Sequence, residues 1–197
     1  MIPRDRLESL TDGIFGFAMT LLVTALVLPD GFLPTTNSDL LTALLNLDSG
    51  LVAYAISFVV LAVRWSGIAA SKGIPDEVSG AYFWAAIIHL FFITTMPFST
   101  MVIGRYGVFP AAVWLYAANM ALAALASLVM SFLAERDTGQ KPDHTGRLDL
   151  IILILSALLS GILSPFLGDK AMYAYFLNFA KPLADRFMPD SWRRRLE

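Results

Sequence analysis

The sequence predicts an all-α, polytopic integral membrane protein with six transmembrane helices. Of its 197 residues 57% are hydrophobic and only 15% are charged, and the mean hydropathy is +0.66. One soluble core of this size does not bury so much apolar surface. Six apolar runs, each long enough to cross a bilayer, and a one-sided distribution of Lys and Arg complete the evidence.

The six runs leave no room for a sizeable soluble domain, because six spans of roughly 20 residues use about 120 of the chain. We therefore expect one membrane domain over residues 1–197 with no internal repeat. The predicted spans cover residues 13–29, 49–70, 81–104, 109–134, 148–167 and 171–188.

The first run carries no charge between Asp12 and Asp30. We expect it to be retained as a span and not cleaved as a signal peptide, because Asp5 and Glu8 make its leading segment mixed in charge and no small-residue cleavage site precedes Pro29. The second run passes Arg64 and ends before Lys72.

The third run contains Pro97, which predicts a kink, and the Ala-rich fourth run contains Asn119, which we expect to hydrogen-bond to another helix. The fifth run follows Arg147. The sixth run is the weakest, so five spans is the alternative count. It is interrupted by Asn178, Lys181, Pro182, Asp185 and Arg186.

Loop charge predicts the orientation, since Lys and Arg near membrane ends favour the cytoplasm. With six spans and a cytoplasmic N-terminus, all fourteen Lys and Arg residues except Arg105 and Lys170 lie on the inner side. The loop over residues 30–48 has none. Both termini are therefore expected to be cytoplasmic.

Several functional classes are excluded by composition and motif. A net charge of −2 gives no basic field for nucleic acid, and the absence of cysteine removes thiolate metal sites and cysteine nucleophiles. With only two histidines and no catalytic or nucleotide-binding motif, we expect neither an enzyme nor a bound cofactor or metal. The lipid bilayer is the partner that the composition requires.

When the first span is drawn as a helix, one face carries a stripe of small, hydroxylated and aliphatic residues around a phenylalanine. Phe17 lies at the centre of this stripe, which also contains Gly13, Thr20, Leu21, Thr24 and Leu28. The opposite side contains Phe15, Met19, Leu22 and Leu26. Two interpretations remain open. Gly16, Thr20 and Thr24 form a small-residue row for helix packing, or the stripe faces a pore in which Thr oxygens replace part of an ion's water shell.

A family resemblance follows from these residues. The segment Arg6-Leu-Glu-Ser-Leu-Thr-Asp12-Gly-Ile-Phe-Gly-Phe17-Ala-Met-Thr20-Leu-Leu-Val resembles the opening of the transmembrane protein 175 family, the lysosomal potassium channel and its prokaryotic homologues. Further matches follow in order at Tyr54-x-x-Ser57-Phe58, Trp65 and Pro97-Phe98-Ser99-Thr100. Together they cover about half of the chain.

The resemblance implies a potassium-permeable cation channel in the bacterial plasma membrane, without a re-entrant filter loop, assembled as a homotetramer. The family's apolar constriction then falls on Phe17 and its pore threonine on Thr20. The helical stripe extends the set, with Leu21 and Leu28 as further pore-lining residues and Thr24 as a second ion-coordinating residue. Potassium and other monovalent cations are the expected permeant ions.

Three other polar residues carry open alternatives. Arg6 and Asp12 are an interfacial anchor and a helix cap, or, as the resemblance implies, parts of a polar network at the cytoplasmic end of the pore helix. His89 is a neutral residue hydrogen-bonded to a neighbouring helix, or a proton-sensitive gate element.

The alternatives to a channel are a secondary transporter or proton-coupled permease, and a non-conducting membrane scaffold.

Overall fold

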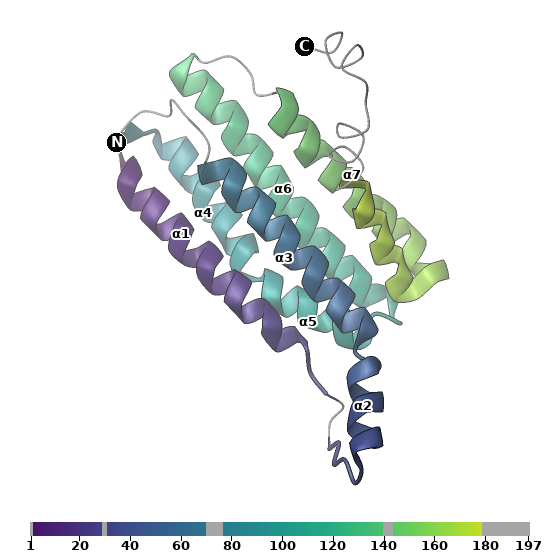
Figure 1. Ribbon diagram of the computed structural model, residues 1–197. Helices are drawn as coiled ribbons and strands as arrows, with labels where there is room; N and C mark the ends of the chain where they lie inside the picture. The colour runs from purple at the N-terminus through teal and green to yellow at the C-terminus, as the bar shows by residue number, and fades with distance from the viewer. Residues whose placement is uncertain (1, 29–30, 70–76, 140–143, 179–197) are drawn as a thin grey trace, which may run out of the picture.

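The computed structural model describes residues 2–28, 31–69, 77–139 and 144–178, and within these ranges it confirms an all-α polytopic membrane protein (Figure 1). Five helical segments of the described chain are long and apolar enough to span a bilayer. They cover Arg4–Ala25, Ser49–Ala69, Gly80–Tyr106, Pro110–Thr138 and His144–Phe176.

The first span is α1 (Arg4–Leu21), which tightens into the 3₁₀ helix η1 (Leu22–Ala25). It begins earlier than the apolar run, and an ion pair between Arg4 and Glu8, one turn apart, lies in its first turns. The helix ends at Ala25, so Leu28 lies three residues beyond it. Leu28 also precedes Pro29, and a proline ring disfavours helical backbone at the residue before it. The expectation of one helix over 13–29 is corrected accordingly.

The loop after η1 contains a short helix that the sequence analysis did not predict, α2 (Asn37–Leu45). Its N-terminus has a reciprocal cap: the Asp39 amide donates to Thr36 Oγ1 at 3.1 Å, and the Thr36 amide donates to Asp39 Oδ2 at 2.8 Å. The second span, α3 (Asp48–Ala69), follows directly and matches the predicted run.

The third span is broken, as Pro97 predicts. α4 (Gly80–Thr94) ends at Thr95, and α5 (Met96–Tyr106) begins with Pro97 in its first turn. Asn119 of α6 (Pro110–Thr138) bonds across this break. It accepts from Thr95 Oγ1 at 2.8 Å and donates to Ser99 Oγ at 3.1 Å, which is the interhelical role expected of it.

The fifth span, α7 (His144–Leu167), is followed by a reversal of the chain. Gly168 has a φ of 57°, a left-handed conformation that glycine adopts readily, and the 3₁₀ helix η2 (Gly168–Phe176) folds back alongside α7 (Figure 1). Only the beginning of the predicted span 171–188 lies in the described part of the chain, so the structure supports five spans and the sixth lies mostly outside it.

The helices are arranged so that α1 lies at one edge of the bundle and α7 at the other (Figure 1). The main neighbours of α1 are α4 and α3, and η1 packs on α5. A two-residue pairing of β1 (Ile2–Pro3) with β2 (Glu77–Val78) joins the start of α1 to the segment before α4. One long face of α1 therefore has no helix of the described chain against it.

Candidate functional site

The two faces of α1 differ sharply in burial. The residues that pack against the bundle are Leu7, Thr11, Phe15 and Ala18, continued in η1 by Leu22 and Ala25. Phe15 is completely buried, whereas Phe17, two residues further on, is 75% exposed. The rotation of the helix between these two positions places one phenyl ring in the core and the other on the open face.

The predicted stripe lies on this open face. Gly13, Phe17, Thr20, Leu21 and Thr24 are all exposed, with Leu21 at 49%. Leu28 is half-buried and lies after the end of η1, so it is not part of the helical stripe. On the opposite side Phe15 and Leu22 are buried, and Met19 and Leu26 are half-buried.

The small-residue row Gly16, Thr20 and Thr24 is also exposed. A Cβ atom added at Gly16 would meet nothing within 4 Å. Within the described ranges, no helix of the same chain therefore uses this row as a packing surface. Close packing on this row has to come from residues beyond the described ranges or from another molecule.

The two threonine hydroxyls of the stripe are held in one orientation by the backbone. Thr20 Oγ1 donates to the Phe17 carbonyl at 2.9 Å, and Thr24 Oγ1 donates to the Leu21 carbonyl at 2.6 Å. A hydroxyl has one hydrogen and two lone pairs. Because the hydrogen is engaged with the helix backbone, each oxygen presents its lone pairs to whatever occupies the open face.

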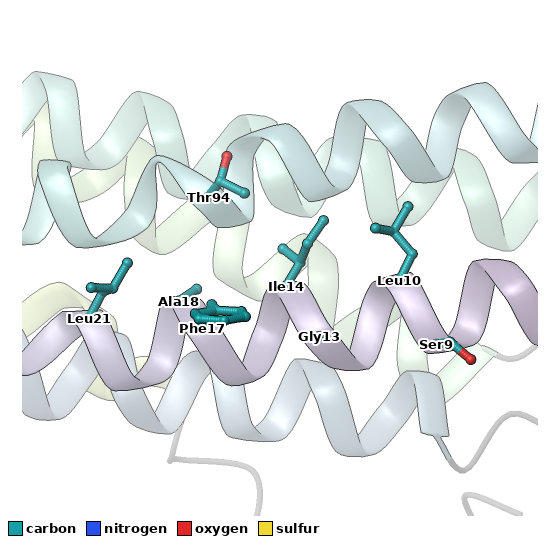
Figure 2. A pocket seen from close by; sticks show the side chains of 8 residues that line it. All are labelled: Ser9, Leu10, Gly13, Ile14, Phe17, Ala18, Leu21 and Thr94. Atoms are coloured by element: carbon teal, nitrogen blue, oxygen red, sulfur yellow. The ribbon is translucent and has the colours of Figure 1, made fainter.

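An apolar groove of about 330 Å³ runs along α1 on the side of α4. Figure 2 shows Leu10, Ile14 and Leu21 of α1 directed toward the helix that carries Thr94. Phe17 borders the same groove. The open face of α1 therefore has two parts: the stripe, which carries the threonine oxygens, and the apolar groove beside it.

Asp12 is fixed to the second span. The indole Nε1 of Trp65 on α3 donates to Asp12 Oδ1 at 2.9 Å. Arg6 is exposed, and within the described residues its side chain has no hydrogen bond or ion pair, so the structure does not join Arg6 and Asp12 into one network. Of the two predicted motif residues, Asp12 alone connects α1 to another span here.

A buried hydroxyl cluster holds the bundle together behind α1. Ser57 Oγ lies 2.8 Å from Thr100 Oγ1 and 2.9 Å from the Tyr116 hydroxyl, so the cluster joins α3, α5 and α6. The resemblance included Ser57 and Thr100, whereas sequence reasoning missed Tyr116. A tyrosine in the middle of an apolar run was the available signal, because a buried phenol requires a partner.

His89 is buried, with 1% of its surface exposed. Its Nδ1 lies 2.9 Å from the Ala123 carbonyl oxygen of α6, and its ring lies 6.0 Å from that of Phe15, centroid to centroid. The hydrogen bond to a neighbouring helix agrees with the first of the two expected roles. His89 contacts the packing face of α1, not the open one.

The charged groups near the candidate site are few. Within the described ranges, no three His, Cys, Asp or Glu side chains are grouped so that they could hold a metal ion.

In the loop after α1, hydrogen bonds from the side chains of Thr35 and Thr36 keep the pKa of the exposed Asp39 carboxyl below its ordinary value. This side of the protein thus keeps a negative charge at neutral pH.

Comparison with known proteins gives consistent results. Residues 6–97 match the family model of the endosomal/lysosomal potassium channel TMEM175. A potassium channel of Chryseobacterium sp. is 25% identical over 139 residues, which are 71% of this chain and 69% of that protein. A potassium channel of Chamaesiphon minutus is 29% identical over 107 residues, 54% of this chain and about half, 52%, of that protein. No solved structure matches the chain.

Proposed function

We propose that the chain is a member of the transmembrane protein 175 family and a potassium channel whose pore is formed by the open faces of several copies of α1. Both relatives are named potassium channels, and the matched residues 6–97 include the whole of α1. Conduction along an electrochemical gradient needs no cofactor and no catalytic residue. The permeant ion is potassium, and other monovalent cations pass less readily.

The observation that carries the proposal is the open face of α1. Its stripe of Gly13, Phe17, Thr20, Leu21 and Thr24 is exposed although it lies in a membrane-spanning helix. Lipid tails offer the two threonine hydroxyls no hydrogen-bond partners. An aqueous path, by contrast, brings them into contact with ions and water. One chain cannot enclose a path on its own outer surface, so other copies must supply the remaining walls.

We propose a homotetramer with α1 of each subunit nearest the axis, as in the family that the sequence resembles. Fourfold symmetry turns each residue of the stripe into a ring of four. The lone pairs of Thr20 and Thr24 then point inward and replace part of the hydration shell of a potassium ion. Because these oxygens come from side chains of α1, no re-entrant filter loop is needed.

Phe17 is the proposed constriction. It is the bulkiest side chain of the stripe and three-quarters of its surface is free. A ring of phenyl groups narrows the path and excludes water, which is how apolar constrictions close pores. Leu21 supplies a second apolar ring one turn later. Leu28 is not part of this set, because it lies outside the helix.

The proposed orientation places both termini in the cytoplasm of a bacterium and the channel in its plasma membrane. The distribution of Lys and Arg supports this for the six-span count, in which all but two of them lie on the inner side. The loop of α2 then lies outside, where the ionised Asp39 and the absence of basic residues over 30–48 favour the approach of cations.

The test is the ionic current of the purified protein in planar bilayers under a potassium gradient. We expect an ohmic cation current with a preference for potassium over sodium. Thr20→Val should lower this preference several-fold, because it removes an oxygen and keeps the side-chain shape. Thr94→Val is the matched control: Thr94 makes the same bond to the carbonyl three residues earlier, at 2.7 Å, but lies on α4.

The outcome separates the proposal from its alternatives. Saturable uptake of a substrate coupled to an ion gradient would indicate a transporter. The absence of a cation current in every variant would indicate a non-conducting membrane scaffold. A strict monomer in a functional membrane would also contradict the proposal, because the open face of α1 would then have no opposing wall. If Thr20→Val and Thr94→Val changed the preference for potassium over sodium equally, α1 would not be the element that determines selectivity.

A further inference from the structure

A small cavity lies within the bundle, behind the packing face of α1. Its volume is about 10 Å³, and it is lined by side chains of α3, α4, α5, α6 and α7. Two of the lining residues are polar, Arg64 of α3 and His89 of α4. The remaining walls are aliphatic or thioether side chains, so His89 and Arg64 decide what the cavity holds.

The hydrogen bond of His89 defines the state of its second nitrogen. A carbonyl oxygen only accepts hydrogen bonds, so Nδ1, 2.9 Å from the Ala123 carbonyl oxygen, must carry the hydrogen. In a neutral imidazole Nε2 is then an unprotonated acceptor. This Nε2 is buried and has no hydrogen-bond partner among the residues that the structure describes.

A buried acceptor without a donor is costly, since in the unfolded chain it would be bonded to water. The cavity has the volume that one water molecule occupies, which is of the order of 10–15 Å³. Arg64 borders the same cavity with a guanidinium group that has five N–H donors, one of which reaches Ser127 Oγ at 3.0 Å. The residues that line the cavity thus supply both an acceptor and donors for a water molecule.

We propose that this cavity is a binding site for one internal water molecule, which donates a hydrogen bond to His89 Nε2 and accepts one from Arg64. The water joins α3 to α4, and His89 continues the chain of hydrogen bonds to α6 through Ala123. The ring of His89 in turn supports Phe15 of α1. The site does not depend on the channel function, because it rests only on the interior of one chain.

The experiment uses the full-length protein in lipid nanodiscs, labelled with ¹⁵N histidine. The chain has two histidines, and His144 is exposed, so His144→Gln leaves the signals of His89 alone. Long-range ¹H–¹⁵N correlation should show a protonated Nδ1 and an unprotonated Nε2 whose shift is that of a hydrogen-bonded acceptor. A protonated Nε2, or an unprotonated Nε2 with the shift of a free acceptor, would overturn the proposal.

A second measurement detects the water itself. With ¹³C-labelled alanine methyl groups in deuterated protein, a bound water should give a cross-peak to Ala124, which lines the cavity. Ala86 is the matched control, because it is as deeply buried and belongs to a separate core cluster. A cross-peak to Ala124 and none to Ala86 supports the site, and the absence of a cross-peak to Ala124 shows a dry cavity.

Discussion

Phe15 and Phe17 provide a direct test of how α1 is oriented, because the same substitution at the two positions should have opposite consequences. Phe15→Ala removes a ring that is completely buried among core residues and in contact with His89. Phe17→Ala removes a ring of which 75% is exposed. The first change should damage stability, and the second should change conduction.

The expected magnitudes follow from burial. Truncating a fully buried Phe to Ala costs about 3–5 kcal/mol in lost contacts and cavity formation. For a chain of this length, each kcal/mol lowers Tm by roughly 2–4 °C, so Phe15→Ala should lower Tm by roughly 6–20 °C. Only about a quarter of the Phe17 ring surface is covered, so the same reasoning gives about 1 kcal/mol and roughly 2–4 °C.

Thermal unfolding of the purified protein in one detergent measures both shifts, and potassium flux into liposomes measures conduction. Phe17→Ala should increase the flux, because four phenyl rings no longer narrow the proposed path. A loss of Tm at Phe17→Ala as large as that at Phe15→Ala would refute the assignment, since Phe17 would then be packed between subunits. An unchanged flux at Phe17→Ala would refute its role as the constriction.

Two further predictions concern the contacts that hold α1 and α5 in place. Gly104→Ala should lower Tm, because its Cβ would lie 3.1 Å from the Cα of Gly50 and force α5 away from α3. Gly50→Ala is the matched control and should be tolerated, since its Cβ would meet only a flexible Leu26 methyl group at 3.8 Å. A double-mutant cycle on thermal stability tests the 2.9 Å hydrogen bond between Asp12 and Trp65. Asp12→Ala and Trp65→Phe each remove it and should couple by about 1 kcal/mol, and additive effects would show that this bond does not stabilise α1 on α3.

Much of the fold could be predicted from the sequence, because bilayer spans are specified by long apolar runs. The run 49–70 matches α3 closely, and Pro97 predicted the break between α4 and α5. The differences arise at run ends and in loops. α1 begins at Arg4, ahead of its apolar run, and the chain reverses direction at Gly168 after α7. The short helix α2 begins with a local capping box that a hydropathy pattern does not detect.

The candidate site was predictable where it depends on helical periodicity. Phe17, Thr20, Leu21 and Thr24 lie on one exposed face because they are spaced along a helix. Leu28 lies after the helix ends, so helical spacing does not place it on this face. The pairing of Asp12 with Trp65 was not predictable in this way. It joins residues 53 positions apart in sequence, and no local pattern encodes such a contact.

The sequence by itself determined that the chain lies in a bilayer, roughly where it crosses, and which residues of α1 share a face. These properties depend on composition and on the periodicity of a single helix, so they need no knowledge of neighbours. Only the tertiary structure decided which face of α1 is open. That choice depends on which side α3 and α4 cover, and it is the packing of those helices on Phe15 that leaves Phe17 and the threonine oxygens exposed.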